Sequence, residues 1–135
     1  MTLFVLFSLN LISPMLGISF TNICEAKGSI YVGVYAKKAD FLKPEKACFK
    51  KIIPVSVKGN LDFDCSELAP GTYAVSCFHD LNDNGELDTN FFGIPVEPYG
   101  FSNNARPKFR APRWEEACFQ VKEGGLQISI RLEKW

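Results

Sequence analysis

Residues 29–35 read Ser29-Ile30-Tyr31-Val32-Gly33-Val34-Tyr35. Apolar β-branched side chains recur at every second position, so they share one face of an extended chain and predict a half-buried β-strand. Similar runs follow at spacings of about ten residues, with Gly or Pro turns between several of them. They cover 51–58, 60–65, 72–78, 114–121 and 126–132. We therefore expect an all-β single domain, an antiparallel β-sandwich of Greek-key or immunoglobulin-like type, with a small barrel as the alternative.

The composition is that of an ordinary globular domain. The chain has 135 residues, with 15 Lys and Arg against 15 Asp and Glu and a net charge of zero. A neutral chain does not fit a nucleic-acid-binding domain held by a basic face, so no nucleic-acid partner is expected. Hydrophobic residues make up 47% and charged residues 22%, which excludes an intrinsically disordered chain.

The N-terminal part of the chain has the character of a targeting segment. Residues 3–20 are mostly apolar, and no Lys or Arg precedes Lys27. Small residues at Cys24 and Ala26 fit a cleavage site, so we expect a signal peptide over residues 1–26 and a mature domain over residues 27–135. The mature protein would be secreted or periplasmic, with no membrane span after cleavage. A retained membrane anchor and a lipid on Cys24 are the alternatives.

Cleavage after Ala26 would leave an even number of cysteines in an oxidising compartment, where disulfides form. We expect two bridges, and Cys65 with Cys77 is the favoured pair because these residues flank one turn. The second bridge would join Cys48 with Cys118. The alternative is that all four are small buried apolar residues.

The segment after the strand at 72–78 reads Asp80-Leu81-Asn82-Asp83-Asn84-Gly85-Glu86-Leu87-Asp88. Oxygen-bearing side chains at its first, third, fifth and ninth positions, with Gly at the sixth, match the front half of an EF-hand calcium loop. The twelfth position is Phe91 rather than Glu, so the site would be shortened and weak. We expect calcium ligands from Asp80, Asn82, Asn84, the carbonyl of Glu86, and Asp88. A plain turn rich in Asp and Asn is the alternative.

Residues 80–112 show no clear period, and a loop of that length in a compact domain is usually functional. Its second half combines aromatic rings with Asn amides, a composition that suits contact with a carbohydrate or a peptide. The alternative is that the rings close the open end of the sandwich. The expected ligand-binding residues are His79, Phe92, Tyr99, Phe101, Asn103 and Asn104.

Residues 70–75, 78–90 and 92–105 resemble the bacterial secreted domain-of-unknown-function family 2141. The likeness is carried by the calcium-loop-like run above and by Phe92-Gly93-Ile94-Pro95 and Tyr99-Gly100-Phe101-Ser102-Asn103-Asn104. The resemblance implies an exported, β-sandwich-like domain and adds no catalytic residue. The cysteines lie outside the pattern of that family, so the disulfides rest on this sequence alone.

The sequence contains no established catalytic motif. His79 beside Asp80 is the only His, no nucleophile elbow accompanies it, and Asp88 with Glu97 is the only carboxylate pair that fits glycoside hydrolysis. The leading interpretation is an exported, non-catalytic module of the cell envelope or extracellular space that binds calcium and an unidentified ligand. A small secreted hydrolase that uses His79, Asp80 and Asp88 is the alternative, and an inert structural domain is the third.

Overall fold

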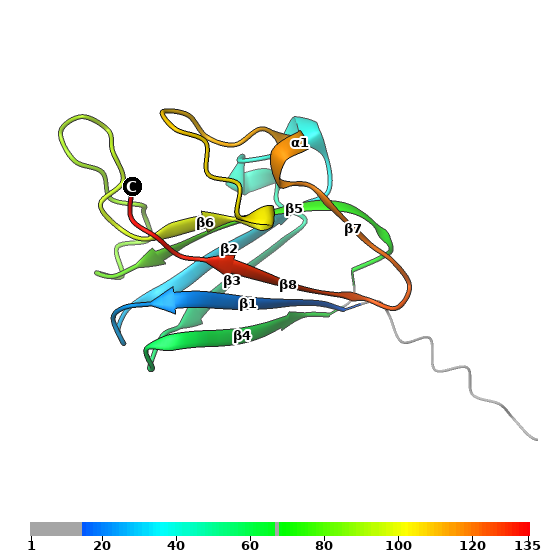
Figure 1. Cartoon of the computed structure of the whole chain (residues 1–135), viewed down its shortest axis with the longest axis horizontal. Coiled ribbons are helices and arrows are strands. Elements are labelled where there is room, and N and C mark those ends of the chain that lie inside the picture. The colour runs from blue at the N-terminus through cyan, green and yellow to red at the C-terminus, as the bar shows by residue number, and fades with distance from the viewer. Residues whose placement is uncertain (1–14, 67) are drawn as a thin grey trace, which may run out of the picture.

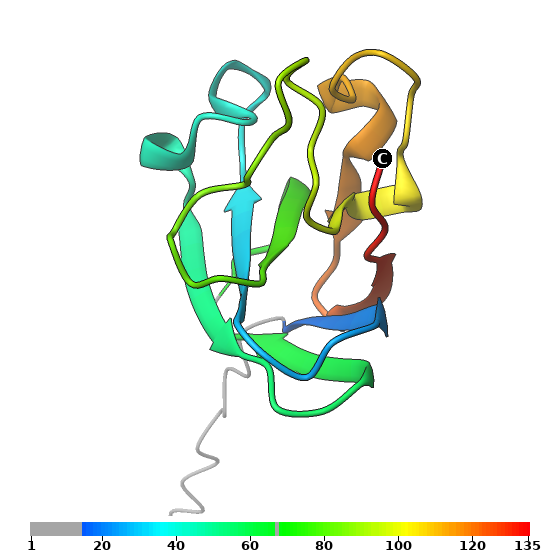
Figure 2. The same ribbon diagram turned by 90° about the vertical axis from the view of Figure 1, so that its left-hand side faces the viewer.

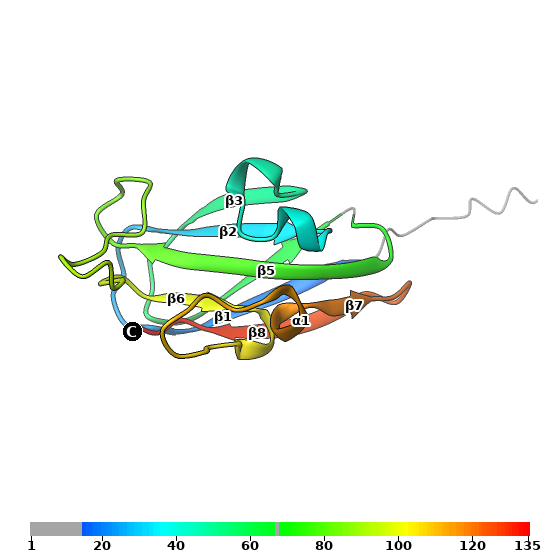
Figure 3. The ribbon, with the colours of Figure 1, turned by 90° about the horizontal axis from the view of Figure 1, so that it is seen from above.

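Two β-sheets lie one above the other in the computed structural model, which describes residues 15–66 and 68–135 (Figures 1 and 3). The first sheet has the order β4-β1-β8 and the second β3-β2-β5-β6, while β7 also pairs with β5. The strands are β1 (Leu16–Ile23), β2 (Ser29–Tyr35), β3 (Phe49–Pro54), β4 (Gly59–Cys65), β5 (Gly71–Asp80), β6 (Tyr99–Phe101), β7 (Phe119–Val121) and β8 (Leu126–Arg131). Short helical turns complete the described chain: η1 (Lys38–Asp40), η2 (Pro44–Lys46), η3 (Ser102–Asn104) and α1 (Trp114–Ala117). The predicted all-β, sandwich-like single domain is confirmed.

The strand β1 corrects the predicted domain boundary, because it lies inside the segment that the sequence assigned to a signal peptide. It is the middle strand of the first sheet, antiparallel to β4 and parallel to β8. Its inward side chains Leu16, Ile18 and Phe20 are fully buried. Cleavage after Ala26 would remove this strand and leave β4 and β8 without a common partner, so a domain limit at residue 27 is wrong. Residues 1–14 lie outside the described residues, and a targeting role for them stays a prediction.

The core forms where the inward faces of the two sheets meet. Ile30, Val32 and Val34 of β2 are buried there, as the alternation of residues 29–35 predicted. The opposite face of β2 is covered at one end, because the ring of Phe41 packs on Tyr35 and on Trp114 of α1, at centroid distances of 5.7 and 5.8 Å. The second sheet is thus buried on its inner face and only partly covered on its outer face.

The two sheets join along one side of the sandwich, where β6 meets the residues after β8. Tyr99 and Glu133 exchange two backbone hydrogen bonds, at 3.0 and 3.1 Å. Gly100 allows this approach, since a Cβ atom there would lie 2.7 Å from the carbonyl oxygen of Arg131. The joined side fixes β6, and with it one end of the long segment between β5 and β6.

The predicted disulfides are not formed, and all five cysteines are free thiols. Cys65 ends β4 in the first sheet, whereas Cys77 lies in β5 of the second, where its thiol donates to the carbonyl of Gly100 at 3.5 Å. Burial raises the pKa of both thiols to about 12. Cys65 and Cys77 therefore follow the alternative interpretation, that of small buried core residues.

Candidate functional site

The segment between β5 and β6, residues 81–98, begins at two buried polar residues, His79 and Asp80. The ring Nε2 of His79 donates a hydrogen bond to the carbonyl of Lys27 at 2.6 Å, and its backbone N–H donates to the carbonyl of Pro98 at 2.8 Å. His79 thus ties together the start of β2, the end of β5 and the return of the segment. The only His of the chain serves as an anchor in this structure.

The carboxylate of Asp80 shapes the first turn of the segment. Its Oδ1 accepts from the backbone N–H of Asn84 at 3.3 Å, and its Oδ2 accepts from that of Gly85 at 2.7 Å. Gly85 has φ = +80°, a value that glycine adopts at little cost. The sharp turn that the calcium-loop pattern predicted at Gly85 is therefore present, and the buried Asp80 lies at its centre.

The other predicted metal ligands converge on Asp88. The side-chain amides of Asn82 and Asn84 each donate to one carboxylate oxygen of Asp88, both at 2.6 Å. Asn84 Oδ1 also accepts from the backbone N–H of Glu86 at 3.0 Å. The structure thus brings Asp80, Asn82, Asn84 and Asp88 into one hydrogen-bonded loop, while the side chain of Glu86 is exposed.

Glu97 is a further member of this loop, although the sequence suggests it only as half of a glycosidase pair. It is 4% exposed, and its two carboxylate oxygens accept from the backbone N–H groups of Leu81 at 2.6 Å and Asp88 at 2.9 Å. The side chain therefore closes the loop from the far end of the segment. Its only sequence signal is an isolated acid between Val96 and Pro98, a pattern too weak to reveal the role.

Acidic charge is concentrated in this segment. No Lys or Arg occurs between Lys58 and Arg106, whereas residues 80–97 contain five acidic residues. None of the five takes part in an ion pair with another of the described residues. Across the described ranges, no group of three or more His, Cys, Asp or Glu side chains is close enough to hold a metal ion. A cation here would therefore depend on the Asn amides and backbone carbonyls as well as on carboxylates.

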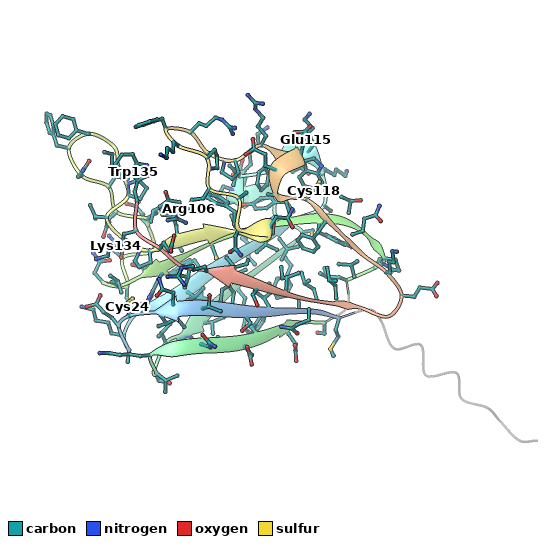
Figure 4. The ribbon with its side chains drawn as sticks, viewed as in Figure 1. Cys24, Arg106, Glu115, Cys118, Lys134 and Trp135 are labelled. Carbon is teal, nitrogen blue, oxygen red and sulfur yellow. The ribbon has the colours of Figure 1, made fainter. Side chains whose placement is uncertain are left out.

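A hollow of about 570 Å³ lies beside the loop, and aromatic rings line much of it. The predicted residues Phe92, Tyr99 and Phe101 line it together with residues that the sequence did not point to, among them Arg106, Phe109 and Trp135. The guanidinium of Arg106 lies over the ring of Tyr99, with its Cζ 4.1 Å from the ring centroid. Figure 4 shows Arg106, Lys134 and Trp135 gathered near the C-terminal end of the chain.

The remaining predicted ligand-binding residues do not line this hollow. The amide of Asn103 donates to the carbonyls of Glu116 and Cys118, at 3.2 and 2.9 Å. Asn104 Oδ1 accepts from the backbone N–H of Arg131 at 2.9 Å. These amides, like the ring of His79, hold neighbouring segments together.

A second hollow, of about 640 Å³, lies on the outer face of the second sheet. It forms above Gly33, beside the cross-strand pair Tyr31 and Phe78, whose rings stack at a centroid distance of 5.0 Å. Gly85, which belongs to the acidic loop, also lines this hollow. None of the residues predicted to bind a ligand or a metal lines it.

The model of the bacterial family DUF2141, described as "Uncharacterized protein conserved in bacteria", matches residues 18–129. The chain belongs to this family. The match begins within β1, which agrees with the place of that strand in the fold. No curated protein and no solved structure matches this DUF2141 chain.

In this DUF2141 domain, the side chains that a hydrolase would use all take part in hydrogen bonds within the fold. His79 donates to a backbone carbonyl, Asp80 caps the first turn of the loop, and Asp88 is held between two amides. The hydroxyl of Ser102 is buried and donates to the carbonyl of Ala117 at 2.5 Å. No observation in the described chain favours hydrolysis.

Among the described residues, no helix has the length and apolar character needed to cross a membrane.

Proposed function

We propose that this DUF2141 protein is an exported, non-catalytic binding module of the cell envelope or extracellular space. Its loop at 80–90 takes Ca²⁺, and the aromatic hollow beside the loop takes a ligand. The observation that carries the proposal is the burial of Asp80 and Glu97 at the base of a loop that contains no basic residue. Carboxylates in such a place are stabilised by hydrogen-bond donors, and a bound divalent cation stabilises them further.

The donor set of the loop suits a hard cation of modest affinity. Asp80 and Asp88 offer carboxylate oxygens. Asn82 and Asn84 offer neutral amide oxygens when each side-chain amide is flipped about χ2, which exchanges its oxygen and its nitrogen. In this structure both amides present nitrogen to Asp88. Each turned amide would bring its oxygen against an oxygen of Asp88, an arrangement that becomes favourable with a cation between them. With so few charged ligands, we expect a dissociation constant of about 10⁻⁴–10⁻³ M.

The loop is connected directly to the hollow. The backbone N–H of Val96 donates to the carbonyl of Asp88 at 2.9 Å, and that of Asn90 donates to the carbonyl of Ile94 at 2.8 Å. These bonds form a narrow hairpin whose tip contains Phe91 and Phe92. A cation that rigidifies Asp88 would therefore also restrict the part of the chain that supplies Phe92 to the hollow.

Export is motivated by the apolar N-terminal run without Lys or Arg. Because β1 is a core strand that begins at Leu16, we propose that a cleaved leader ends before Leu16 rather than after Ala26. Expression of the full chain, followed by cell fractionation and mass spectrometry of the mature N-terminus, tests this part. A mature protein that begins at Lys27 and still folds would contradict it.

Thermal unfolding of the full chain, in calcium and in excess chelator with Mg²⁺ as control, tests the cation site. At about 0.1 mM affinity and about 1 mM free Ca²⁺, binding stabilises the fold by about 1.4 kcal/mol, a rise in Tm of roughly 3–6 °C. We expect Asp88→Asn to abolish this rise. Asp62→Asn, which changes an exposed acid on β4 outside the loop, is the matched control and keeps it. Identical melts of the unmodified protein with calcium and with chelator would overturn the calcium part.

A further inference from the structure

Four aromatic side chains project into solvent at one end of the molecule. Their exposed fractions are 97% for Phe91, 82% for Phe92, 84% for Phe109 and 57% for Trp135. Phe91 and Phe92 pack edge to face at 5.6 Å, and Phe109 and Trp135 pack at 5.9 Å. Phe92, Phe109 and Trp135 also line the same hollow, so the two pairs belong to one surface. We call these four residues the aromatic tip.

The aromatic tip projects from the sandwich rather than covering it. The segment 81–98 and the C-terminus lie at the same end of the molecule, which faces the viewer in Figure 2. Exposed apolar clusters of this kind are uncommon on soluble domains and mark interaction surfaces. Phe91 and Phe92 therefore do not close the end of the sandwich, whereas Tyr99 and Phe101 of β6 are half-buried.

We propose that the aromatic tip is a membrane-docking surface, whose rings enter the interfacial region of a lipid bilayer with anionic headgroups. Phe91 decides between a bilayer and a small ligand, because it is almost fully exposed and does not line the hollow. A ligand seated in the hollow would leave Phe91 in water, whereas a bilayer surface would cover both pairs together. Aromatic side chains are also the residues that favour the membrane interface.

The charges around the aromatic tip suit anionic headgroups. Arg106 and Arg110 line the hollow but pair with Glu133 at 3.6 Å and Glu116 at 2.8 Å, so the free positive charge comes from Lys108 and Lys134, which directly precede Phe109 and Trp135 in the chain. Within the described ranges, Lys108 and Lys134 form no ion pair, so their ammonium groups are available. Each basic residue close to an anionic membrane surface strengthens attachment, and the effect weakens with salt.

The neighbouring loop opposes this attraction until its charge is reduced. Asp83 and Glu86 are exposed there and would repel anionic headgroups. A bound Ca²⁺ lowers the negative charge of the loop, so docking should be stronger in calcium. This calcium dependence rests on the proposed function, whereas insertion of the rings does not.

Co-sedimentation of the full-length protein with vesicles tests the proposal. The vesicles are phosphatidylcholine alone or mixed with phosphatidylglycerol, in calcium or in chelator. We expect binding to the mixed vesicles, and we expect the double substitution Phe91→Ser with Phe92→Ser to weaken it roughly tenfold or more, since two inserted rings are lost. The matched control is Ile52→Ser with Val57→Ser, which replaces side chains 53% and 55% exposed outside the aromatic tip and should leave binding unchanged.

A second readout follows the rings themselves. Trp135 and Trp114 are the two Trp residues of the chain, so in a Trp114→Phe background the fluorescence reports on Trp135 alone. We expect a blue shift when mixed vesicles are added, because the indole leaves water. The melting curve of each variant confirms that it is folded.

The docking proposal would be overturned if the unmodified protein did not bind mixed vesicles or if the Phe91/Phe92 variant bound them equally well. It would also be overturned if the protein formed a dimer that this variant dissociates while vesicles stay unbound. Specific binding of a soluble oligosaccharide or peptide without vesicle binding would also overturn it. Vesicle binding of equal strength in calcium and in chelator, with no calcium effect on melting, would support docking while refuting the calcium site.

Discussion

The buried side chains of the first sheet are apolar, whereas the segment 80–98 buries two carboxylates, those of Asp80 and Glu97. In β1, Leu16, Ile18 and Phe20 have no contact with water and rely on a regular ladder on both sides. In the segment, the side-chain carboxylates of Asp80 and Glu97 each accept hydrogen bonds from two backbone N–H groups. The first arrangement is insensitive to ions and salt, while the second places negative charge where a cation can bind. Substitutions and pH changes should therefore affect the two regions through different forces.

The largest effect is expected from Phe20→Ala in β1. Removing a fully buried ring loses its transfer free energy and leaves a cavity, so the free energy of unfolding should fall by about 3–5 kcal/mol. Chemical denaturation measures the change. Ser19→Ala, on the half-buried opposite face of the same strand, is the control and should change stability far less. Equal, small effects of both substitutions would mean that β1 is not part of the core.

Alkaline pH should destabilise the core next. Burial raises the pKa of Cys65 and Cys77 from 9.0 to about 12, so in the folded protein these thiols stay protonated while in the unfolded chain they ionise. Their contribution is fully present below about pH 9 and is lost as the pH rises toward 12. At pH 10 ionisation of the two thiols in the unfolded chain should lower the free energy of unfolding by at most about 3 kcal/mol. Denaturation curves at pH 8 and 10 measure it.

The double substitution Cys65→Ala with Cys77→Ala is the control for this pH effect. It should remove most of the loss between pH 8 and 10, although it lowers stability at both. The pKa of Tyr35 and Tyr73 is also raised by burial, and these groups add to the decline above pH 10. An unchanged pH slope in the double variant would show that the thiols do not cause the decline.

A smaller effect is expected from Glu97→Gln in the loop. The substitution turns one acceptor into an amide NH₂ that faces a backbone N–H, so stability should fall by about 1–3 kcal/mol. Hydrogen exchange of the Leu81 and Asp88 amides should accelerate more than exchange in β2, which localises the change. Glu86→Gln, at an exposed acid of the same loop, is the control and should leave both amides protected. Uniform acceleration across the molecule would contradict a local role.

The smallest effect on stability is expected from Phe91→Ser, because its ring is 97% exposed. The free energy of unfolding should change by less than about 0.5 kcal/mol. A clear loss of stability would show that the ring packs within the fold, and it would then not be free for docking.

The sequence predicted strands where alternation was clear, as in β2, β4 and β8, and β5 from a run that is apolar on both faces. It failed for β1, because Gly17, Ser19 and Thr21 on the outer face are small or weakly polar and leave a run that resembles a leader. The expected strand at 51–58 is displaced, since β3 ends at Pro54, and residues 114–117 form the turn of α1. Pro54 ends β3, and the two Glu residues after Trp114 lie in the helical turn α1. A period-two pattern of apolar residues does not reveal such local effects.

The site was predictable only where its residues are close in sequence. The spacing of Asp80, Asn82, Asn84 and Asp88 indicated a loop, and these residues do converge. The sequence could not place Trp135 and Phe109 at the hollow that Phe92 lines, because their meeting there depends on the bridge between Tyr99 and Glu133, which brings distant segments together. The free thiols were missed because the disulfide argument relied on compartment rather than on which sheet each cysteine occupies.

The parallel pairing of β1 with β8 joins parts of the chain that are far apart in sequence, since its first paired residues are Leu16 and Leu126. Until β8 pairs, one edge of β1 has no partner, and the apolar inner face of that strand cannot be enclosed. Contacts of such long sequence separation form slowly, so the first sheet should be completed late in folding.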